Sequence, residues 1–495
     1  MEEKKVRIQL QRHLWPDEVE ERKHRRRSKV LLIVMLVCSF VLGLVVGGNV
    51  LSTKQAQPVV SSISNKLDSV YSILKYNWYF GTLDENIDQH LVDRALYGMT
   101  ASEEDPHTTY MSSEELESFT TSIDLGFVGI GVQYTTADNL NMITRVFHNS
   151  PAEKSGVIAG DIIYRVDGML VSEMEPDSLA DYVKGEEGTN VTIEFLRDNE
   201  IIEKVITRGA VQNTAFGEMM ENDIGYLEIY QFGSSTGYEV KEYLNLMSSM
   251  GMKKLILDLR DNTGGYLDAY EAVASYFVDA NETIMQQIYS DGSVDLSVSR
   301  GGKFENIEDI VILVNGNTAS AAEVLTVCLQ ELRDDVTVLG TTTYGKGTVQ
   351  VTHTFADGSA IKFTTSKWVS PSGVWVNGTG IEPDVTVELP EVLYYTYARM
   401  EENEQYVYDS VSSYVKIAQQ SLEFLDYDIN RTDGYLDKAT ETQLIAFQKE
   451  FGCQQLGVLD TETFEALIAQ VTKRWSIEKE ADNQLQAALS VLKGE

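Results

Sequence analysis

The stretch from Asp309 to Gln350 reads DIVILVNGNTASAAEVLTVCLQELRDDVTVLGTTTYGKGTVQ and decides the fold class. Its first apolar run, DIVILVN, predicts a buried strand, and the apolar spacing of AAEVLTVCLQEL predicts a helix directly after it. Strand-like VTVLG and VQVTHTF follow, and the same alternation of strands and helices covers residues 223–389. This order is typical of an α/β core. Because ligands in such sheets bind beyond the carboxyl ends of the strands, we expect a site in the loops there.

Ser320 lies in one of these loops, where the strand gives way to the helix. Unpaired N–H groups and the positive end of the helix dipole favour a developing oxyanion at this position, so Ser320 is a candidate nucleophile. Serine is also an ordinary N-cap residue, and spacing alone favours that structural role. A serine nucleophile needs a base, and no histidine after the N-terminal apolar run stands in a recognisable triad setting.

Lys346 offers another base, because Ser-Lys pairs replace the histidine in some serine hydrolases. It lies on the glycine-flanked turn Gly345-Lys346-Gly347, where its amine can fold inward instead of pointing to water. An amine that acts as a base must be neutral near pH 7. Lowering the lysine pKa that far takes roughly 4 kcal/mol of desolvation and neighbouring donors. We therefore expect burial of Lys346.

Three segments of this rim resemble those of the C-terminal processing peptidases, also called tail-specific proteases. They read DLRDNTGG at 258–265, NGNTASAAE at 315–323 and GKGTVQ at 345–350. The resemblance covers residues 60–390 and implies a serine protease core at 210–390. We expect neither a metal nor another cofactor in this core.

The same resemblance implies roles for individual residues. Ser320 would be the nucleophile, Lys346 the general base and Gln350 the residue that orients the lysine. The oxyanion donors would be the backbone N–H of Ala321 and that of a glycine in the pair Gly264-Gly265.

The spacing of Lys346 and Gln350 raises a geometric question. On a straight strand the two side chains would point the same way but lie about 13 Å apart, too far for a hydrogen bond. The chain must therefore bend at Gly345 or Gly347, or Gln350 must act indirectly.

A mostly β module precedes the core. Between residues 125 and 208 short β-rich runs alternate with glycines, and SPAEKSGVIAGDIIYRVDG at 150–168 resembles the PDZ domains of bacterial proteases. The turn Gly129-Ile130-Gly131 offers backbone N–H groups for the carboxylate of a peptide, beside a strand edge that could accept the peptide. The alternative is that these glycines only allow tight turns. We expect a PDZ domain at 121–209 that binds the C-terminal tails of protein substrates.

The N-terminal residues bear on location. Residues 30–51 read VLLIVMLVCSFVLGLVVGGNVL, carry no charge and are long enough to cross a bilayer as a helix. A basic cluster at residues 22–29 precedes them, and such clusters remain in the cytoplasm. We expect a cytoplasmic tail at 1–29, a single transmembrane helix at 30–51 in the cell membrane, and an extracytoplasmic remainder that begins with a helical arm at 52–120. A cleaved signal peptide is the alternative.

The C-terminal part contains a short repeat. After a helical linker at 391–417, the segments GYLDKAT and GVLDTET each combine a glycine turn, an Asp or Thr cap and a following apolar helix. The arrangement resembles small three-helix peptidoglycan-binding domains. We expect such a domain at 418–472, with peptidoglycan as its partner, and a helical tail at 473–495. A helical cap without affinity for glycans is the alternative.

The charge balance excludes one class of partner. The chain has 40 Lys and Arg against 76 Asp and Glu, a net charge of −36, which repels nucleic-acid phosphates. Its three cysteines are too scattered for a disulfide framework or a zinc site. The predicted fold class is an α/β protease core with an inserted mostly β PDZ domain, an N-terminal transmembrane helix, a helical arm and a small all-α C-terminal domain.

These observations predict a membrane-anchored serine endopeptidase that acts outside the cytoplasm. Its substrates would be proteins recognised by their C-terminal tails, and its mechanism would use Ser320, Lys346 and Gln350. We also expect a homo-oligomer, a dimer. A non-catalytic scaffold that uses the PDZ and wall-binding modules to localise partners is the alternative function.

Overall fold

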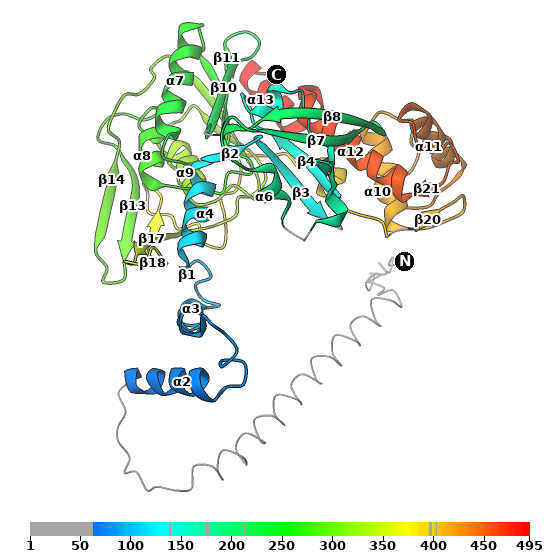
Figure 1. Ribbon diagram of the computed structural model, residues 1–495. Helices are drawn as coiled ribbons and strands as arrows, with labels where there is room; N and C mark the ends of the chain where they lie inside the picture. Colours follow the sequence, from blue (N-terminus) through cyan, green and yellow to red (C-terminus); the bar gives the residue numbers. More distant parts are fainter. Residues whose placement is uncertain (1–62, 138–139, 175–177, 212, 396–397, 402) are drawn as a thin grey trace, which may run out of the picture. The chain divides into compact units, whose positions relative to one another are not determined.

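The computed structural model describes residues 63–137, 140–174, 178–211, 213–395, 398–401 and 403–495 (Figure 1). Within these ranges no helix combines the length and the apolarity needed to cross a bilayer. The predicted fold class is corrected on this point, because it included a transmembrane helix at 30–51. Those residues, like the predicted cytoplasmic tail at 1–29, lie outside the described residues.

The chain divides into two compact units, residues 1–92 and 93–495. The described part of the first unit contains helix α2 (Ile63–Asn77) and the beginning of helix α3 (Ile87–Thr100). In the second unit, strand β1 (Thr109–Met111) and helix α4 (Ser113–Asp124) follow. Ser112 and Glu115 form a capping box at the start of α4, which explains why a helix begins there.

The PDZ region is an antiparallel sheet with its own core. Its strands run in the order β3-β4-β5-β7-β8, so β3 is an edge strand. A separate apolar cluster, which includes Ile130, Ile143 and Phe195, fills this region. The strands are β3 (Val132–Ala137), β4 (Leu140–Val146), β5 (Ile162–Val166), β7 (Asn190–Arg197) and β8 (Glu200–Thr207). The short elements are β2 (Phe127–Gly129), α5 (Pro151–Lys154), β6 (Met169–Leu170), η1 (Val171–Glu173), α6 (Leu179–Val183) and β9 (Gly209–Val211).

A six-stranded sheet forms the centre of the predicted protease core. Its order is β10-β11-β12-β15-β16-β19, in which β10 is antiparallel to β11 and the other neighbours are parallel. This is the α/β arrangement that the alternating pattern predicts. The strands are β10 (Ala215–Met219), β11 (Ile224–Ile229), β12 (Lys254–Asp258), β15 (Asp309–Val314), β16 (Val336–Gly340) and β19 (Val385–Thr386).

Helices cover both faces of this central sheet. Helices α7 (Thr236–Ser249), α8 (Leu267–Ala274) and α9 (Ala321–Leu332) share one apolar cluster with Leu257 and Ile312. The opposite face, with Ile256 and Val311, packs against the C-terminal helix α13 (Asn483–Lys493). Helix α13, within the predicted tail at 473–495, is therefore part of the predicted core, because it covers apolar side chains that the strands turn away from α7, α8 and α9.

A second antiparallel sheet lies in the core. Its order is β1-β18-β13-β14, and β17 also pairs with β18. The strands not yet named are β13 (Thr283–Tyr289), β14 (Val294–Val298), β17 (Thr348–Thr354) and β18 (Ala360–Val369). Strand β17 begins two residues after Lys346, so this sheet positions the predicted base.

The C-terminal module is helical (Figure 1). The two halves of the sequence repeat have matching caps, because Asp437 and Asp460 each accept a hydrogen bond from the backbone N–H three residues later. PDZ residues Met142 and Ile162 complete the apolar cluster of this module. Its elements are η2 (Glu391–Tyr395), β20 (Gln405–Tyr406), α10 (Ser413–Phe424), α11 (Lys438–Glu450), β21 (Leu459–Asp460), α12 (Thr461–Ile477) and η3 (Lys479–Ala481).

Candidate active site

Ser320 has a backbone conformation that distinguishes it from ordinary N-cap serines. Ser112 and Ser150 cap helices with extended backbones, at φ −62° and −70°. Ser320 precedes α9 at φ 55° and ψ −121°. This pair of angles lies outside the left-handed region that turn residues adopt, and such conformations cost about 1–3 kcal/mol and cluster at functional sites. This strain favours the catalytic interpretation of Ser320 over capping alone.

The buried carboxylate of Glu323 joins the loop of Ser320 to the loop of Lys346. Its Oε2 accepts hydrogen bonds from the backbone N–H of Ser320 at 2.9 Å and of Lys346 at 2.8 Å. Its Oε1 accepts from the Gly345 N–H and the Thr343 hydroxyl, each at 2.6 Å. A carboxylate that loses its water needs such donors. This role was not predicted, although the Ser-x-x-Glu spacing of Ser320 and Glu323 is a capping-box signal.

Gly264 brings the DLRDNTGG loop against the predicted nucleophile. A Cβ atom on Gly264 would lie 2.7 Å from Ser320 Cβ and 2.9 Å from the Ala321 nitrogen, so only glycine fits. The Gly264 N–H donates to Asn262 Oδ1 at 2.8 Å. Among the described residues, the N–H groups of Ala321 and Gly265 have no acceptor. These two donors are therefore the ones available to an oxyanion.

Asn262 is a second residue whose role was not predicted. It is fully buried, and its Nδ2 donates to the Ile229 carbonyl at 2.7 Å. Its own carbonyl accepts from the Ala319 N–H at 2.9 Å. Asn262 thus fixes the glycine loop to the sheet and to the residue before Ser320. The polar Asn within DLRDNTGG was the only sequence signal for this role.

The surroundings of Lys346 lower the pKa of its amine. Burial lowers the pKa of Lys346, the positive charge of Lys362 lowers it further, and Glu323 opposes both effects. The direction is the one expected of a general base. In the described part of the chain, the Lys346 amine is not hydrogen-bonded to the Ser320 hydroxyl or to Gln350.

Gln350 lies on β17 and bonds to two threonines. Its Nε2 donates to Thr348 Oγ1 at 2.9 Å and to Thr364 Oγ1 at 3.1 Å. The pairing of β17 with β18 shifts register between Val349 and Gln350, so the strand is irregular at this point. The structure therefore does not join Gln350 directly to Lys346, and its role in orienting the lysine stays a prediction.

The predicted carboxylate loop of the PDZ region precedes the edge strand β3. Gly131 has φ 80°, and a Cβ there would lie 2.4 Å from Ser150 Cβ, which explains the glycine. The carbonyls of Ile130 and Gly131 accept hydrogen bonds from Ala152 and Phe147. Their N–H groups donate to no other residue that the structure describes. Gly129 pairs with Gly209 between β2 and β9, which positions the turn.

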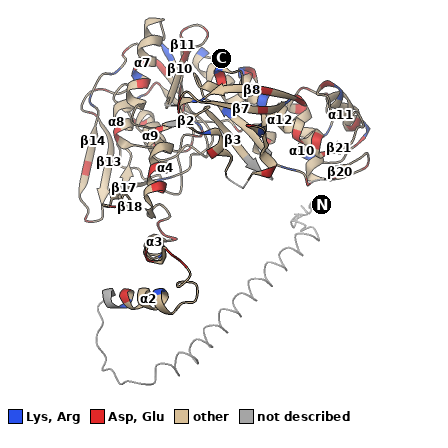
Figure 2. Cartoon of the chain, in the orientation of Figure 1, with Lys and Arg blue, Asp and Glu red and all other residues tan. Residues whose placement is uncertain are grey.

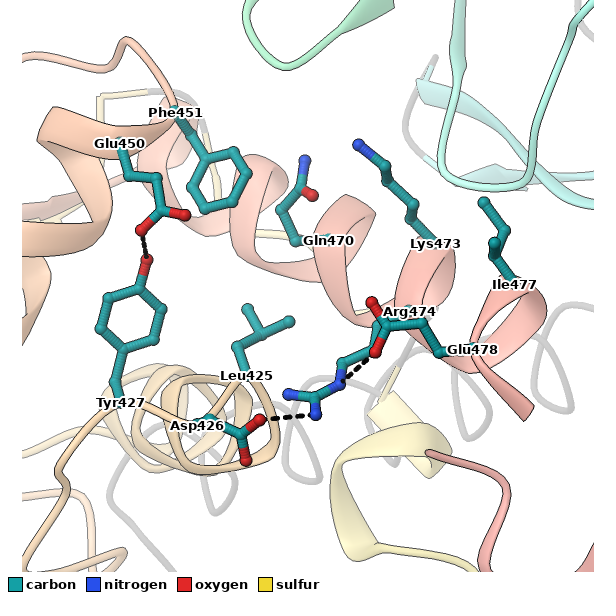
Figure 3. A pocket seen from close by; sticks show the side chains of 10 residues that line it. All are labelled: Leu425, Asp426, Tyr427, Glu450, Phe451, Gln470, Lys473, Arg474, Ile477 and Glu478. Carbon is teal, nitrogen blue, oxygen red and sulfur yellow. Dashed lines mark hydrogen bonds and ion pairs between the residues drawn. The ribbon is translucent and has the colours of Figure 1, made fainter. Parts of the chain in front are cut away.

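A separate pocket of about 520 Å³ lies in the C-terminal module (Figure 3). Tyr427 and Phe451 supply aromatic rings to its wall, and the Tyr427 hydroxyl donates to Glu450 at 2.7 Å. Arg474 forms ion pairs with Asp426 at 2.6 Å and with Glu478 at 3.0 Å. Figure 2 shows acidic and basic positions interspersed along this module. Aromatic faces beside fixed polar groups suit a ligand with both apolar faces and hydroxyl or amide groups.

Three family models match the chain. Residues 223–387 match peptidase family S41, residues 142–197 match a PDZ domain, and residues 412–467 match a putative peptidoglycan binding domain. The first match contains the loops of Ser320, Lys346 and Gly264.

Two curated relatives agree with these matches, and one solved structure is given for comparison. The carboxy-terminal processing protease CtpA of Bacillus subtilis is 33% identical over 478 residues, which cover 95% of this chain and 100% of that protein. A probable CtpA-like serine protease of Staphylococcus saprophyticus is 31% identical, over 86% of this chain and 85% of that protein. The solved photosystem II D1 C-terminal processing protease is 25% identical, with a TM-score of 0.42, and the match covers 68% of this chain and 95% of that chain. Because the Bacillus subtilis relative is 33% identical and is matched over its whole length, the chain belongs to the C-terminal processing proteases of peptidase family S41.

Proposed function

We propose that this protease is an endopeptidase that uses Ser320 as nucleophile and Lys346 as general base. The observation that carries this proposal is the carboxylate of Glu323, which holds the backbones of both residues at 2.8–2.9 Å. The strained backbone of Ser320 and the lowered pKa of Lys346 support the same assignment.

The proposed reaction follows from these groups. Ser320 Oγ attacks the carbonyl carbon of the scissile bond while the neutral Lys346 amine takes the hydroxyl proton. The N–H groups of Ala321 and Gly265 stabilise the oxyanion of the tetrahedral intermediate. The Lys346 ammonium then protonates the leaving amine, and a water molecule, deprotonated by the same lysine, hydrolyses the acyl-enzyme.

Substrates would be selected by their C-terminal tails. The N–H groups of Ile130 and Gly131 can bind a terminal carboxylate, and the edge strand β3 can pair with the residues before it. Amidation of the C-terminus of a substrate peptide should therefore raise its KM, and an unchanged KM would argue against this mode of selection.

A serine-directed phosphonate probe tests the proposed nucleophile. Labelling of the full-length protein should be lost in Ser320→Ala and strongly reduced in Lys346→Ala, while circular dichroism spectra stay unchanged. Absence of labelling in the wild-type protein, under several activating conditions, would favour the non-catalytic scaffold.

The C-terminal module would place this activity at the cell wall, outside the cytoplasm. Two observations support the proposal: the match to a peptidoglycan binding domain, and the pocket with Tyr427 and Phe451 in its wall. The full-length protein should co-sediment with purified sacculi, and Tyr427→Ala should weaken that binding while Tyr408→Ala, outside the pocket, should not. Equal binding by both variants would argue for another site, and no binding by the wild type would favour a helical cap.

The proposed assembly is a homodimer. A dimer would bring two protease cores to one wall site, which raises the effective concentration of each at a substrate held there. Light scattering of the purified protein measures its mass directly. A mass equal to that of one 55.4 kDa chain at micromolar concentration would contradict the proposal.

A further inference from the structure

A hydrogen-bonded chain connects Gln350 to a carboxylate far away in the sequence. Gln350 Nε2 donates to Thr364 Oγ1 at 3.1 Å, and Thr364 Oγ1 donates to Asp105 Oδ1 at 3.0 Å. Gln350 lies on β17 and Thr364 on β18, whereas Asp105 lies in the loop before β1. The loop of Asp105 therefore reaches the strand that follows Lys346.

The loop of Asp105 is firmly held. Its second oxygen, Oδ2, accepts from the Thr108 hydroxyl at 2.6 Å, and Thr108 Oγ1 accepts from the Thr364 N–H at 3.0 Å. Strand β1 then pairs with β18, with Tyr110 opposite Ile361. The carboxylate of Asp105 thus has a fixed position relative to β18.

Asp105 acts as an acceptor only. Burial would raise its pKa, but hydrogen bonds from Thr108, Thr364 and the His107 N–H outweigh burial and lower it. An ionised carboxylate has no proton to donate, so the Thr364 hydroxyl must point its proton at Asp105. Because its proton is used, Thr364 Oγ1 can form further hydrogen bonds only as an acceptor.

This polarity determines which end of the Gln350 amide faces the threonines. Only Nε2 can donate to Thr364 Oγ1 and Thr348 Oγ1, so Oε1 is the end that stays free. Among the described residues, Gln350 Oε1 has no hydrogen-bond partner. An amide oxygen is the group that can accept a hydrogen bond from a lysine ammonium, whereas the NH₂ end would repel it.

Thr348, which accepts from Gln350 Nε2 at 2.9 Å, lies two residues after the predicted base. Burial lowers the pKa of His107, and the positive charges of Lys346 and Lys362 lower it further, while Asp105 opposes them. The Lys362 amine also lies 4.4 Å from the centre of the Phe119 ring. Lys362 and Glu323 thus act on the charge of Lys346, and Lys346 acts on that of His107.

We propose that Asp105 is a positioning residue that, through Thr364, fixes the amide of Gln350 with its oxygen free for the Lys346 ammonium. This inference rests on the proposed Ser320–Lys346 mechanism. The ammonium forms when the lysine takes the proton of Ser320, so the network acts after substrate has bound and leaves ground-state binding unchanged.

Kinetics of matched variants test the inference. Asp105→Asn can donate as well as accept, and Thr364→Val removes the hydroxyl at nearly constant shape. Each should lower kcat about tenfold while KM changes less than about twofold, because a hydrogen bond to a charged group is lost in the transition state. Thr364→Ser keeps the hydroxyl and should retain most of the wild-type kcat. Thermal unfolding of every variant shows whether it is folded at the assay temperature.

A double-mutant cycle completes the test. In a Gln350→Leu background, Asp105→Asn should cause no further loss of kcat, because both substitutions remove the same interaction. Wild-type kcat in both Asp105→Asn and Thr364→Val, or a full second loss in the Gln350→Leu background, would overturn the inference. Failure of the wild-type protein to react with the phosphonate probe would instead refute the proposed mechanism itself.

Discussion

In both the protease core and the C-terminal module, a buried side-chain oxygen accepts a hydrogen bond from the backbone N–H of a residue at positive φ. In the module, buried Gln419 and Gln448 accept hydrogen bonds from the N–H groups of Gly434 at 2.9 Å and Gly457 at 3.0 Å. Both glycines have positive φ, at 89° and 65°, which costs glycine little. In the core, buried Glu323 does the same for Ser320, at φ 55°. The comparison shows that a buried acceptor can hold either a glycine with a relaxed backbone or a serine with a strained backbone.

The difference lies in what the held residue carries. Gly434 and Gly457 carry no side chain that could react, whereas Ser320 carries a hydroxyl. Serine at positive φ stores strain that the surrounding hydrogen bonds must offset. We infer that the positive φ of Ser320 marks a functional position, whereas a positive φ at Gly434 or Gly457 needs no functional explanation.

Removal of the Glu323 carboxylate should have the largest effect on both stability and activity. Glu323→Ala leaves the N–H groups of Ser320, Gly345 and Lys346 without their partner, which should lower the free energy of unfolding by about 3 kcal/mol or more. Peptide hydrolysis should fall by at least about 100-fold, because both loops lose their common anchor. Chemical denaturation and a peptide cleavage assay measure the two effects.

Glu323→Gln is the matched control for that prediction. It keeps one carbonyl oxygen and presents an NH₂ group to donors, so its activity should lie between those of Glu323→Ala and the wild type. Wild-type activity in Glu323→Ala would show that Glu323 does not organise the site.

A serine placed in the module should reproduce the strain without the function. Gly434→Ser puts a Cβ atom 2.6 Å from the Ser412 carbonyl oxygen at φ 89°. We expect a loss of about 2 kcal/mol in the free energy of unfolding, measured by chemical denaturation, with peptide hydrolysis unchanged. Ser410→Gly, at a nearby position, serves as the control. A fully stable Gly434→Ser variant would contradict the strain argument.

Relief of the strain in the core should have a smaller effect. Ser320→Gly and Ser320→Ala both remove the nucleophile, but only glycine is relaxed at φ 55°. The free energy of unfolding of Ser320→Gly should therefore be about 1 kcal/mol higher than that of Ser320→Ala. The reverse order of stability would mean that the conformation of Ser320 is not strained.

A charge next to Lys346 should shift the pH dependence of the reaction. Burial and the positive charge of Lys362 lower the pKa of Lys346, so Lys362→Gln should raise that pKa. Only the neutral amine acts as a base, and activity rises as pH increases through the pKa. The rising limb of the kcat/KM profile should therefore move to higher pH in Lys362→Gln. Lys367→Gln, on the same strand, should leave it in place, and an unmoved limb in both variants would exclude the charge effect.

The sequence predicted the loops of the site better than the contacts between them. The resemblance of short motifs to those of the family pointed to Ser320, Lys346 and the glycine pair, and their catalytic roles stay predictions. Asn262 was overlooked, because a single polar residue inside a loop motif has no distinct signal. The prediction of a transmembrane helix in the fold class was wrong for the described residues, in which no helix is long and apolar enough.

The sequence alone determined the order of strands and helices, the glycine turns and the family, because apolar periodicity and short motifs are local properties of the chain. Only the tertiary structure decided that α13 covers one face of the central sheet, that Glu323 joins two loops, and that Asp105 reaches Gln350 through Thr364. These contacts join residues far apart along the chain. They depend on which side chains the packed sheets bring within about 3 Å of each other, and no local pattern records that choice.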